Sequence, residues 1–182
     1  MSLVGAVLVV SVLVCACQGN GGTPTLSVSS PPLRAPTASV TSASAPVVAR
    51  DKAIAAYRGM WAAYQTAAET ANPDDPDLPT YATEGALRTL VSGLKSIKDR
   101  GLVARGDIVV NPRVTAVEPA DDPTTIEITD CADDSKSLLY RKSGGLYNDK
   151  PGGRRLIIAT VKDIGGGVWK VVSFGARDIG TC

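Results

Sequence analysis

Residues 47–71 read VVARDKAIAAYRGMWAAYQTAAETA, and this stretch decides how the folded part of the chain begins. Its larger apolar side chains recur three and four positions apart, at Ile54, Tyr57, Trp61, Tyr64, Ala68 and Ala71. That spacing places them on one face of an α-helix. The pair Asn72-Pro73 ends the pattern, because proline cannot continue a helix. The stretch therefore predicts a long helix over 47–71 with an aromatic stripe on its buried face.

After this helix the sequence predicts an acidic, proline-rich loop over 73–79, a short turn at 81–82 and a second helix over 86–100. Five apolar residues share one side of the second helix: Leu87, Leu90, Val91, Leu94 and Ile97. Gly101 is a typical helix stop. We interpret the aspartates of 73–79 as a solvated turn rather than a calcium site, because prolines interrupt them and no glutamate follows at loop position twelve.

From residue 102 onward apolar residues alternate with polar ones, which is the period of β-strands. We expect strands at 102–105, 107–118, 124–131, 136–142, 154–162 and 168–175. The glycine clusters 144–145, 152–153 and 165–167 are interpreted as hairpin turns, and Arg154-Arg155 as protection of a strand edge. Helices followed by a run of antiparallel strands predict a single α+β domain.

The chain of 182 residues carries 19 Lys+Arg against 18 Asp+Glu and contains no histidine. This charge balance lacks the basic excess that is typical of nucleic-acid-binding proteins. Without histidine there is no Ser-His-Asp triad and no His-ligated zinc site. We therefore expect no nucleic-acid partner, and we assign no catalytic residue, metal or cofactor.

The apolar segment 3–14 is shorter than the roughly 20 residues that a membrane-spanning helix needs, and it indicates a signal peptide. The sequence around Cys17 resembles the lipobox of bacterial lipoproteins, in which a cysteine behind a small residue is acylated and becomes the mature N-terminus. Cys17 follows Ala16, whereas Cys15 follows the branched Val14 and leaves with the signal peptide. An uncleaved anchor and an ordinary secretory signal are the alternatives.

These observations divide the chain into a signal peptide over 1–16, a lipidated cysteine with a Ser/Thr/Pro/Gly-rich linker over 17–46, and a folded domain over 47–182. All aromatic residues, and all charged residues except Arg34, lie in the folded domain. The lipid is expected to hold the protein on the outer face of the cytoplasmic membrane. The Ala/Gly/Val-rich composition and the excess of arginine over lysine favour a high-GC Gram-positive envelope.

Processing at the N-terminus leaves two cysteines, Cys131 and Cys182. Outside the cytoplasm such a pair is expected to be oxidised. We predict a structural disulfide that joins the C-terminus to a mid-chain strand. A redox-active pair is the alternative, but the two cysteines lack C-x-x-C spacing, and the sequence shows no acidifying neighbour.

Three motifs carry a family resemblance: Ala-x-x-x-Tyr-Arg-x-Met-Trp over 53–61, Asp130-Cys131, and Trp-Lys-Val at 169–171 followed by the terminal Gly-Thr-Cys. With the order of elements, they make the domain similar to secreted actinobacterial members of the NTF2-like superfamily, which is also described as ketosteroid-isomerase-like or cystatin-like α+β. The resemblance implies N-terminal helices packed on a strongly curved antiparallel sheet, with a pocket at the mouth of the resulting cone. It also makes a homodimer through the open sheet face an option.

The candidate pocket residues are Tyr57, Trp61, Tyr64 and Asp130. Aromatic residues at helical spacing are found in cores more often than in pockets. On strand 124–131, alternation places Asp130 on the apolar face of Ile126 and Ile128, and Cys131 on the other face. We expect the Asp130 carboxylate to be hydrogen-bonded at the end of that strand; the alternative is a carboxyl group with a raised pKa.

The leading functional hypothesis is a non-catalytic module that binds an apolar small molecule or docks an envelope protein. An isomerase-like or dehydratase-like enzyme is the second, with Tyr57 or Tyr64 and Asp130 as its proton-transfer groups; the sequence shows no separate general base. A prophage-type surface protein that interferes with another particle is the third.

Overall fold

The computed structural model describes residues 44–148 and 150–182, which form a folded unit with its own hydrophobic core. The predicted signal peptide, Cys17 and nearly all of the predicted linker lie outside the described residues. Three helices come first in the chain: α1 (Ala45–Thr70), α2 (Leu78–Tyr81) and α3 (Glu84–Asp99). The helices expected over 47–71 and 86–100 are thus confirmed with small shifts at their ends. In the part of the chain that the structure describes, no helix combines the length and apolarity needed to cross a membrane.

The strands form two antiparallel sheets, which confirms the α+β class. One sheet has the order β1-β4-β5, with β1 (Leu102–Arg105), β4 (Leu138–Arg141) and β5 (Leu146–Asn148). The other has the order β2-β3-β6-β7, with β2 (Arg113–Glu118), β3 (Thr125–Asp133), β6 (Arg154–Asp163) and β7 (Trp169–Ala176). The four-stranded sheet is neither closed nor strongly curled.

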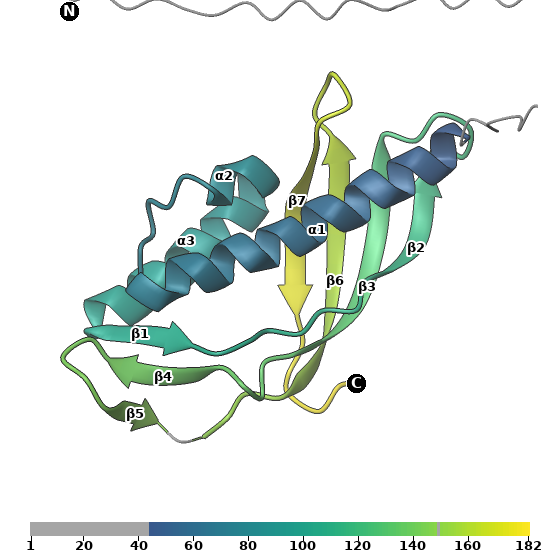
Figure 1. The fold of residues 1–182 in the computed structure, drawn as a ribbon. Coiled ribbons are helices and arrows are strands. Elements are labelled where there is room, and N and C mark those ends of the chain that lie inside the picture. Colours follow the sequence, from purple (N-terminus) through teal and green to yellow (C-terminus); the bar gives the residue numbers. More distant parts are fainter. Residues whose placement is uncertain (1–43, 149) are drawn as a thin grey trace, which may run out of the picture. The chain divides into compact units, whose positions relative to one another are not determined.

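α1 lies across one face of the four-stranded sheet and extends from β2 at its N-terminal end to β1 at its C-terminal end (Figure 1). Its buried face alternates small and large side chains. Ala53, Ala56 and Ala67 are almost fully buried, and so are Tyr57 and Met60. The alanines let the helix approach its neighbours closely, and the large side chains fill the space that remains, as dense core packing requires.

Several strand boundaries differ from those expected. β2 begins at Arg113 rather than at 107, because Pro112 cannot donate to a sheet ladder and the chain bends back at Gly106. Gly106 has a φ of +104° and approaches the Lys136 carbonyl so closely that a side chain would collide with it. β5 was not expected at all. It pairs with β4 across Gly144-Gly145, so this turn is a hairpin.

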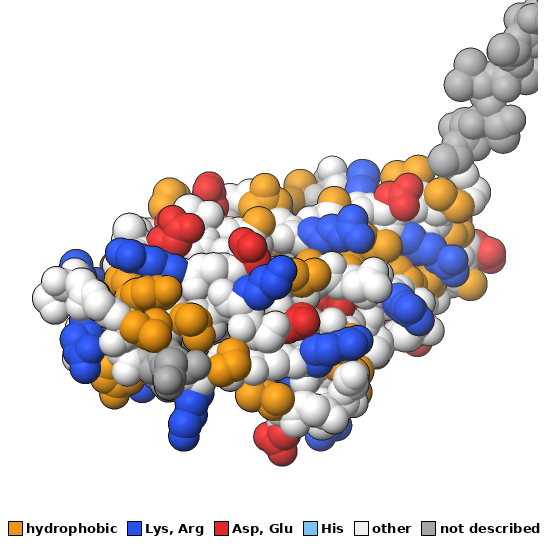
Figure 2. Space-filling model, turned by 60° about the horizontal axis from the view of Figure 1, so that its bottom comes forward, with side chains coloured by type: hydrophobic (Ala, Val, Ile, Leu, Met, Phe, Trp, Pro, Cys, Tyr) orange, Lys and Arg blue, Asp and Glu red, His pale blue; other side chains and the backbone are white. Residues whose placement is uncertain are grey.

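Two further sequence interpretations are wrong. Gly152-Gly153 do not form a hairpin turn, because they lie between β5 of one sheet and β6 of the other. Arg154-Arg155 do not protect a sheet edge, because β6 lies between β3 and β7. The turn at Gly165–Gly167 does join neighbouring strands, β6 and β7, as a hairpin. The surface in Figure 2 mixes hydrophobic, basic and acidic side chains rather than showing a field of one charge sign.

Candidate functional site

A cavity of about 260 Å³ lies between α1, α3 and the inner face of the four-stranded sheet. Most of the side chains that line it are apolar or aromatic. Its lining residues are Trp61, Tyr64, Thr89, Leu90, Gly93, Ile108, Ala132, Asp134, Arg155, Ile157, Phe174 and Ala176. A concave, mostly apolar wall with a few polar groups is the usual composition of a small-molecule site, and the volume of this cavity lies just below the usual range of about 300–1,000 Å³.

Trp61 is the central aromatic residue of this wall. Its ring makes edge contacts with Tyr64 at 6.0 Å and with Phe174 at 5.5 Å between ring centroids. A third edge contact joins it to Tyr57 at 6.4 Å, beneath the cavity. Edge-to-face contacts at these distances stabilise aromatic clusters beyond the burial of their surface. The cluster therefore gives the cavity a rigid aromatic side.

The segment that precedes β2 closes another side of the cavity through Ile108. Gln65 of α1 holds this segment in place. Its side-chain amide is placed to donate to the Ile108 carbonyl and to accept from the Ile108 N–H, both at 3.2 Å. Such paired hydrogen bonds satisfy the backbone of a segment that forms no strand of its own and meets β3 at the isolated Val109–Asp133 bridge.

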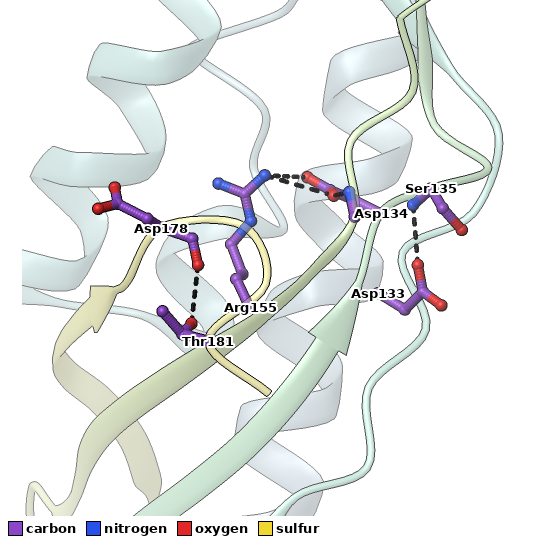
Figure 3. Close-up of polar contacts among 7 residues, drawn as sticks. Asp133, Asp134, Ser135, Arg155, Asp178 and Thr181 are labelled. Carbon is purple, nitrogen blue, oxygen red and sulfur yellow. Dashed lines mark hydrogen bonds and ion pairs between the residues drawn. The ribbon is translucent and has the colours of Figure 1, made fainter.

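Arg155 and Asp134 form an ion pair in the wall of the cavity, with 3.1 Å between Arg155 Nη2 and Asp134 Oδ2 (Figure 3). The alternation along β6 explains why an arginine lies here: Arg155 shares the inner face of the sheet with the buried Ile157, Ala159 and Val161. Arg155 is thus a cavity residue. Arg155 does not protect a strand edge as expected, because β6 is an internal strand and the Arg155 side chain faces the cavity.

Two glycines bring Asp134 to this position. The Gly153 N–H donates to Asp134 Oδ1. A Cβ on Gly152 would lie 2.0 Å from the same oxygen, so only glycine allows this approach. The carboxylate is therefore held by the backbone of the β5–β6 connection before it pairs with Arg155. The adjacent Asp133 is separate: hydrogen bonds from Ser135 lower the pKa of its carboxyl group (Figure 3).

Tyr57 and Asp130 form a second polar pair in the core. The Tyr57 hydroxyl donates to Asp130 Oδ2 at 2.9 Å, and the Asn111 N–H donates to Asp130 Oδ1 at 2.7 Å. Burial raises the pKa of Tyr57 far above its ordinary value, and the nearby Asp130 carboxylate adds to this rise. Tyr57 is therefore a neutral hydrogen-bond donor at neutral pH, and it serves to satisfy a buried carboxylate.

The position of Asp130 differs from the one expected. β3 continues to Asp133, so Asp130 lies within the strand and not at its end. The predicted alternation of buried Ile126, Ile128 and Asp130 is confirmed. Asp130 is 1% exposed and reaches a separate hollow that surrounds the disulfide, not the cavity beneath α1.

The structure thus separates the four candidate pocket residues. Trp61 and Tyr64 line the cavity, whereas Tyr57 and Asp130 do not. Burial raises the pKa of Tyr64, which keeps this phenol neutral as well. Sequence reasoning missed Arg155, Asp134 and Phe174. The alternation along 154–162 is a signal that could have identified Arg155, since it places this residue on the same face as Ile157.

Two buried side-chain nitrogen atoms have no hydrogen-bond partner among the described residues, Trp61 Nε1 and Arg155 Nε. Both belong to residues of the cavity wall. The Trp61 N–H lies near enough to Tyr57 to oppose the rise of the Tyr57 pKa, but it does not reach hydrogen-bond geometry. A buried donor that stays unpaired costs about 1–3 kcal/mol. Both atoms are covered by surrounding protein atoms rather than open to the cavity.

The Cys131–Cys182 disulfide is present and confirms that prediction. Arg154, whose side chain is on the opposite face from Arg155, donates from Nε and Nη2 to Cys131 Sγ at 3.3 and 3.2 Å. The C-terminal tail is also tied to β6 by the Gly180 N–H, which donates to the Arg154 carbonyl. Within the described residues no group of three or more acidic or cysteine side chains is arranged to hold a metal ion.

No protein-family model matches the chain, and no functionally curated protein matches it either. Among solved structures, the crystal structure of the intermembrane space region of the chloroplast protein ARC6 aligns with it at a TM-score of 0.40 and 15% sequence identity. The alignment covers 71% of this chain and 96% of that chain. Similarity at this level supports no argument about fold or function.

Proposed function

We propose that this protein is a membrane-anchored, extracytoplasmic lipoprotein whose folded domain binds an apolar small molecule without transforming it. The observation that carries the proposal is the cavity of about 260 Å³ beneath α1, with its aromatic wall of Trp61, Tyr64 and Phe174. At roughly 30 Å³ for each water-sized group, it holds about eight or nine such groups. This volume suits a short aliphatic chain or a single ring system.

The positions of the polar side chains favour a binding function over a catalytic one. Proton transfer requires a base within hydrogen-bond reach of the substrate. Tyr57 and Asp130 bond to one another in the core and do not line the cavity. The carboxylate that does line it, Asp134, is already paired with Arg155 and with the Gly153 N–H. The enzyme hypothesis thus lacks an available base in the cavity wall.

The proposal includes the anchor, the location and the family resemblance. In this proposal, acylation at Cys17 and the Ser/Thr/Pro/Gly-rich linker hold the domain outside the cytoplasmic membrane, where the Cys131–Cys182 disulfide is stable. A long aromatic helix followed by an antiparallel sheet is the order of elements expected of an NTF2-like domain. This order supports membership in that superfamily as part of the proposal.

The first test is calorimetric titration of octan-1-ol into the secreted chain from residue 18 onward. This chain keeps the core, both sheets and the disulfide, all of which lie within 44–182. We expect binding of one molecule per domain. Thr89→Trp adds a bulky side chain at an exposed position of the cavity wall and should weaken binding strongly.

The matched control is Ser92→Trp, at an exposed position of the same helix that does not line the cavity. It should bind octan-1-ol as the unchanged protein does. Native mass spectrometry of the domain from its own host then shows whether a small-molecule adduct is retained. An inert domain that binds no apolar probe would overturn the proposal and favour a protein partner.

A further inference from the structure

We infer that the ligand of this cavity carries a carboxylate, which the guanidinium of Arg155 binds while the apolar part of the ligand packs against Trp61 and Phe174. The inference rests on the proposed binding function and specifies the ligand class, a short apolar monocarboxylate. Its starting point is a charged guanidinium in a mostly apolar cavity wall, with donors that the protein does not use.

The guanidinium of Arg155 is only partly used by the protein. Its Nη2 donates to both oxygens of Asp134, at 3.1 and 3.4 Å. Its Nε is covered by protein atoms, whereas the side chain as a whole is 28% exposed and Nη1 makes no hydrogen bond in the described part of the chain. A guanidinium presents five N–H donors in a rigid fork that matches a carboxylate. Donors therefore remain for a second acceptor.

Asp134 does not compete for this role, because its oxygens are already occupied. Oδ1 accepts from the Gly153 N–H and from Arg155, and Oδ2 accepts from Arg155. Gly152 fixes the carboxylate from the other side, since no side chain fits between the backbone and Oδ1. Asp134 therefore holds Arg155 at the cavity wall as a positioning residue and leaves the remaining donors of the guanidinium available.

The same arrangement disfavours a cationic ligand. An amine would face the Arg155 guanidinium, and the one carboxylate in the cavity wall is already satisfied. A ligand without any polar group would cover the charged guanidinium in the cavity wall without offering it an acceptor. A carboxylate accepts from Nη1, and its charge is attracted by the guanidinium even though Asp134 offsets part of that attraction.

The experiment compares three ligands of one length, octanoate, octan-1-ol and octylamine, by calorimetric titration into the secreted chain from residue 18 onward at neutral pH. We expect octanoate to bind roughly tenfold more tightly than octan-1-ol, which is typical of a charge-assisted hydrogen bond, and octylamine to bind most weakly. Arg155→Met should abolish the preference for octanoate over octan-1-ol.

Arg154→Met is the matched control, because Arg154 is the neighbouring arginine with its side chain at the disulfide. It should keep the preference for octanoate. If Arg155→Met fails to melt cooperatively, the double variant Asp134→Asn/Arg155→Met removes both charges of the pair and should lose the same preference. Equal affinity for octanoate and octan-1-ol, or tighter binding of octylamine, would overturn the inference while leaving the apolar site in place. Absence of binding by all three ligands would overturn the proposed function itself.

Discussion

The Tyr57 hydroxyl and the Asp130 carboxylate, 73 positions apart in sequence, are joined by a 2.9 Å hydrogen bond between α1 and β3. Both side chains are almost completely buried. A buried carboxylate is tolerated only when donors surround it, and here Asn111 supplies the second donor through its backbone. The pair thus connects the N-terminal helix, the sheet and the segment before β2.

Replacing Tyr57 with phenylalanine should lower the free energy of unfolding by about 1–3 kcal/mol, because it removes one donor from a buried carboxylate. Chemical denaturation of the two proteins measures this difference. Tyr140→Phe is the matched control, since the Tyr140 ring lies beneath the Arg105 guanidinium and phenylalanine retains this contact. An equal decrease in the free energy of unfolding in both variants would show that the Tyr57–Asp130 hydrogen bond does not stabilise the fold.

The raised pKa of Tyr57 predicts a loss of stability in alkaline solution. The folded state holds the phenolic proton above the pKa of 10.0 that applies in the unfolded chain, so the stabilisation is complete below pH 10 and is lost as the pH rises further. The slope approaches about 1.4 kcal/mol per pH unit for this group. Denaturation between pH 9 and 11 should show a shallower slope for Tyr57→Phe than for the unchanged protein. Parallel slopes would contradict the prediction.

Removing the disulfide should lower the free energy of unfolding by roughly 4 kcal/mol, as expected for a bridge across 51 positions in the chain-entropy model. The variant Cys131→Ala/Cys182→Ala avoids leaving a single free thiol. Thiol titration of the denatured, non-reduced secreted protein checks the bond directly. Two reactive thiols in that protein would contradict a disulfide in solution.

Gly152→Ala should reduce stability by about 1–3 kcal/mol, because the added methyl group would overlap the Asp134 carboxylate and force a rearrangement. Gly175→Ala is the control, since no atom lies within 4 Å of the position that its Cβ would take. Thermal denaturation of both variants measures the difference. If Gly152→Ala were as stable as Gly175→Ala, the β5–β6 connection would accommodate the added methyl group without loss of stability, which would contradict the prediction.

Cys17→Ala should prevent acylation and either release the protein from the membrane or leave its precursor unprocessed. Metabolic labelling with palmitate, followed by fractionation, measures both effects. Cys15→Ala should retain the label, because Cys15 belongs to the predicted signal peptide. A labelled, membrane-bound Cys17→Ala protein would refute the assignment of the anchor.

The two long helices and most strands were predictable because their signals are local. The spacing of Tyr57, Trp61 and Tyr64 reflects the pitch of a single helix, and alternation in β6 reflects the pleat of a single strand. The short strand β5 lacked such a signal, since three residues are too few to show a period. The chain between Gly106 and Pro112 alternates like a strand, yet it meets β3 at an isolated bridge between Val109 and Asp133 rather than along a continuous ladder. Gly106 turns against the Lys136 carbonyl, and Pro112 cannot donate to a ladder.

The candidate site was predictable only in part, because local sequence patterns do not show which distant segments face one another. The aromatic stripe identified Trp61 and Tyr64, but it could not separate them from Tyr57, which shares their helix face and lies over a different part of the sheet. Arg155 was assigned to an edge because the neighbours of β6 are unknown until the sheet order is known. That order places β6 between β3 and β7.

The amino-acid sequence alone determined the elements whose physics is local: the aromatic helix, the alternating strands and the two cysteines left to form a disulfide. The tertiary structure decided which distant groups meet. It placed the Asp130 carboxylate under the Tyr57 hydroxyl, and it brought Asp134 against Arg155 across 21 positions of the chain. The reason is that periodicity depends on the backbone geometry of one segment, whereas an ion pair or a cavity depends on sheet order and register, which the packing of the whole domain selects.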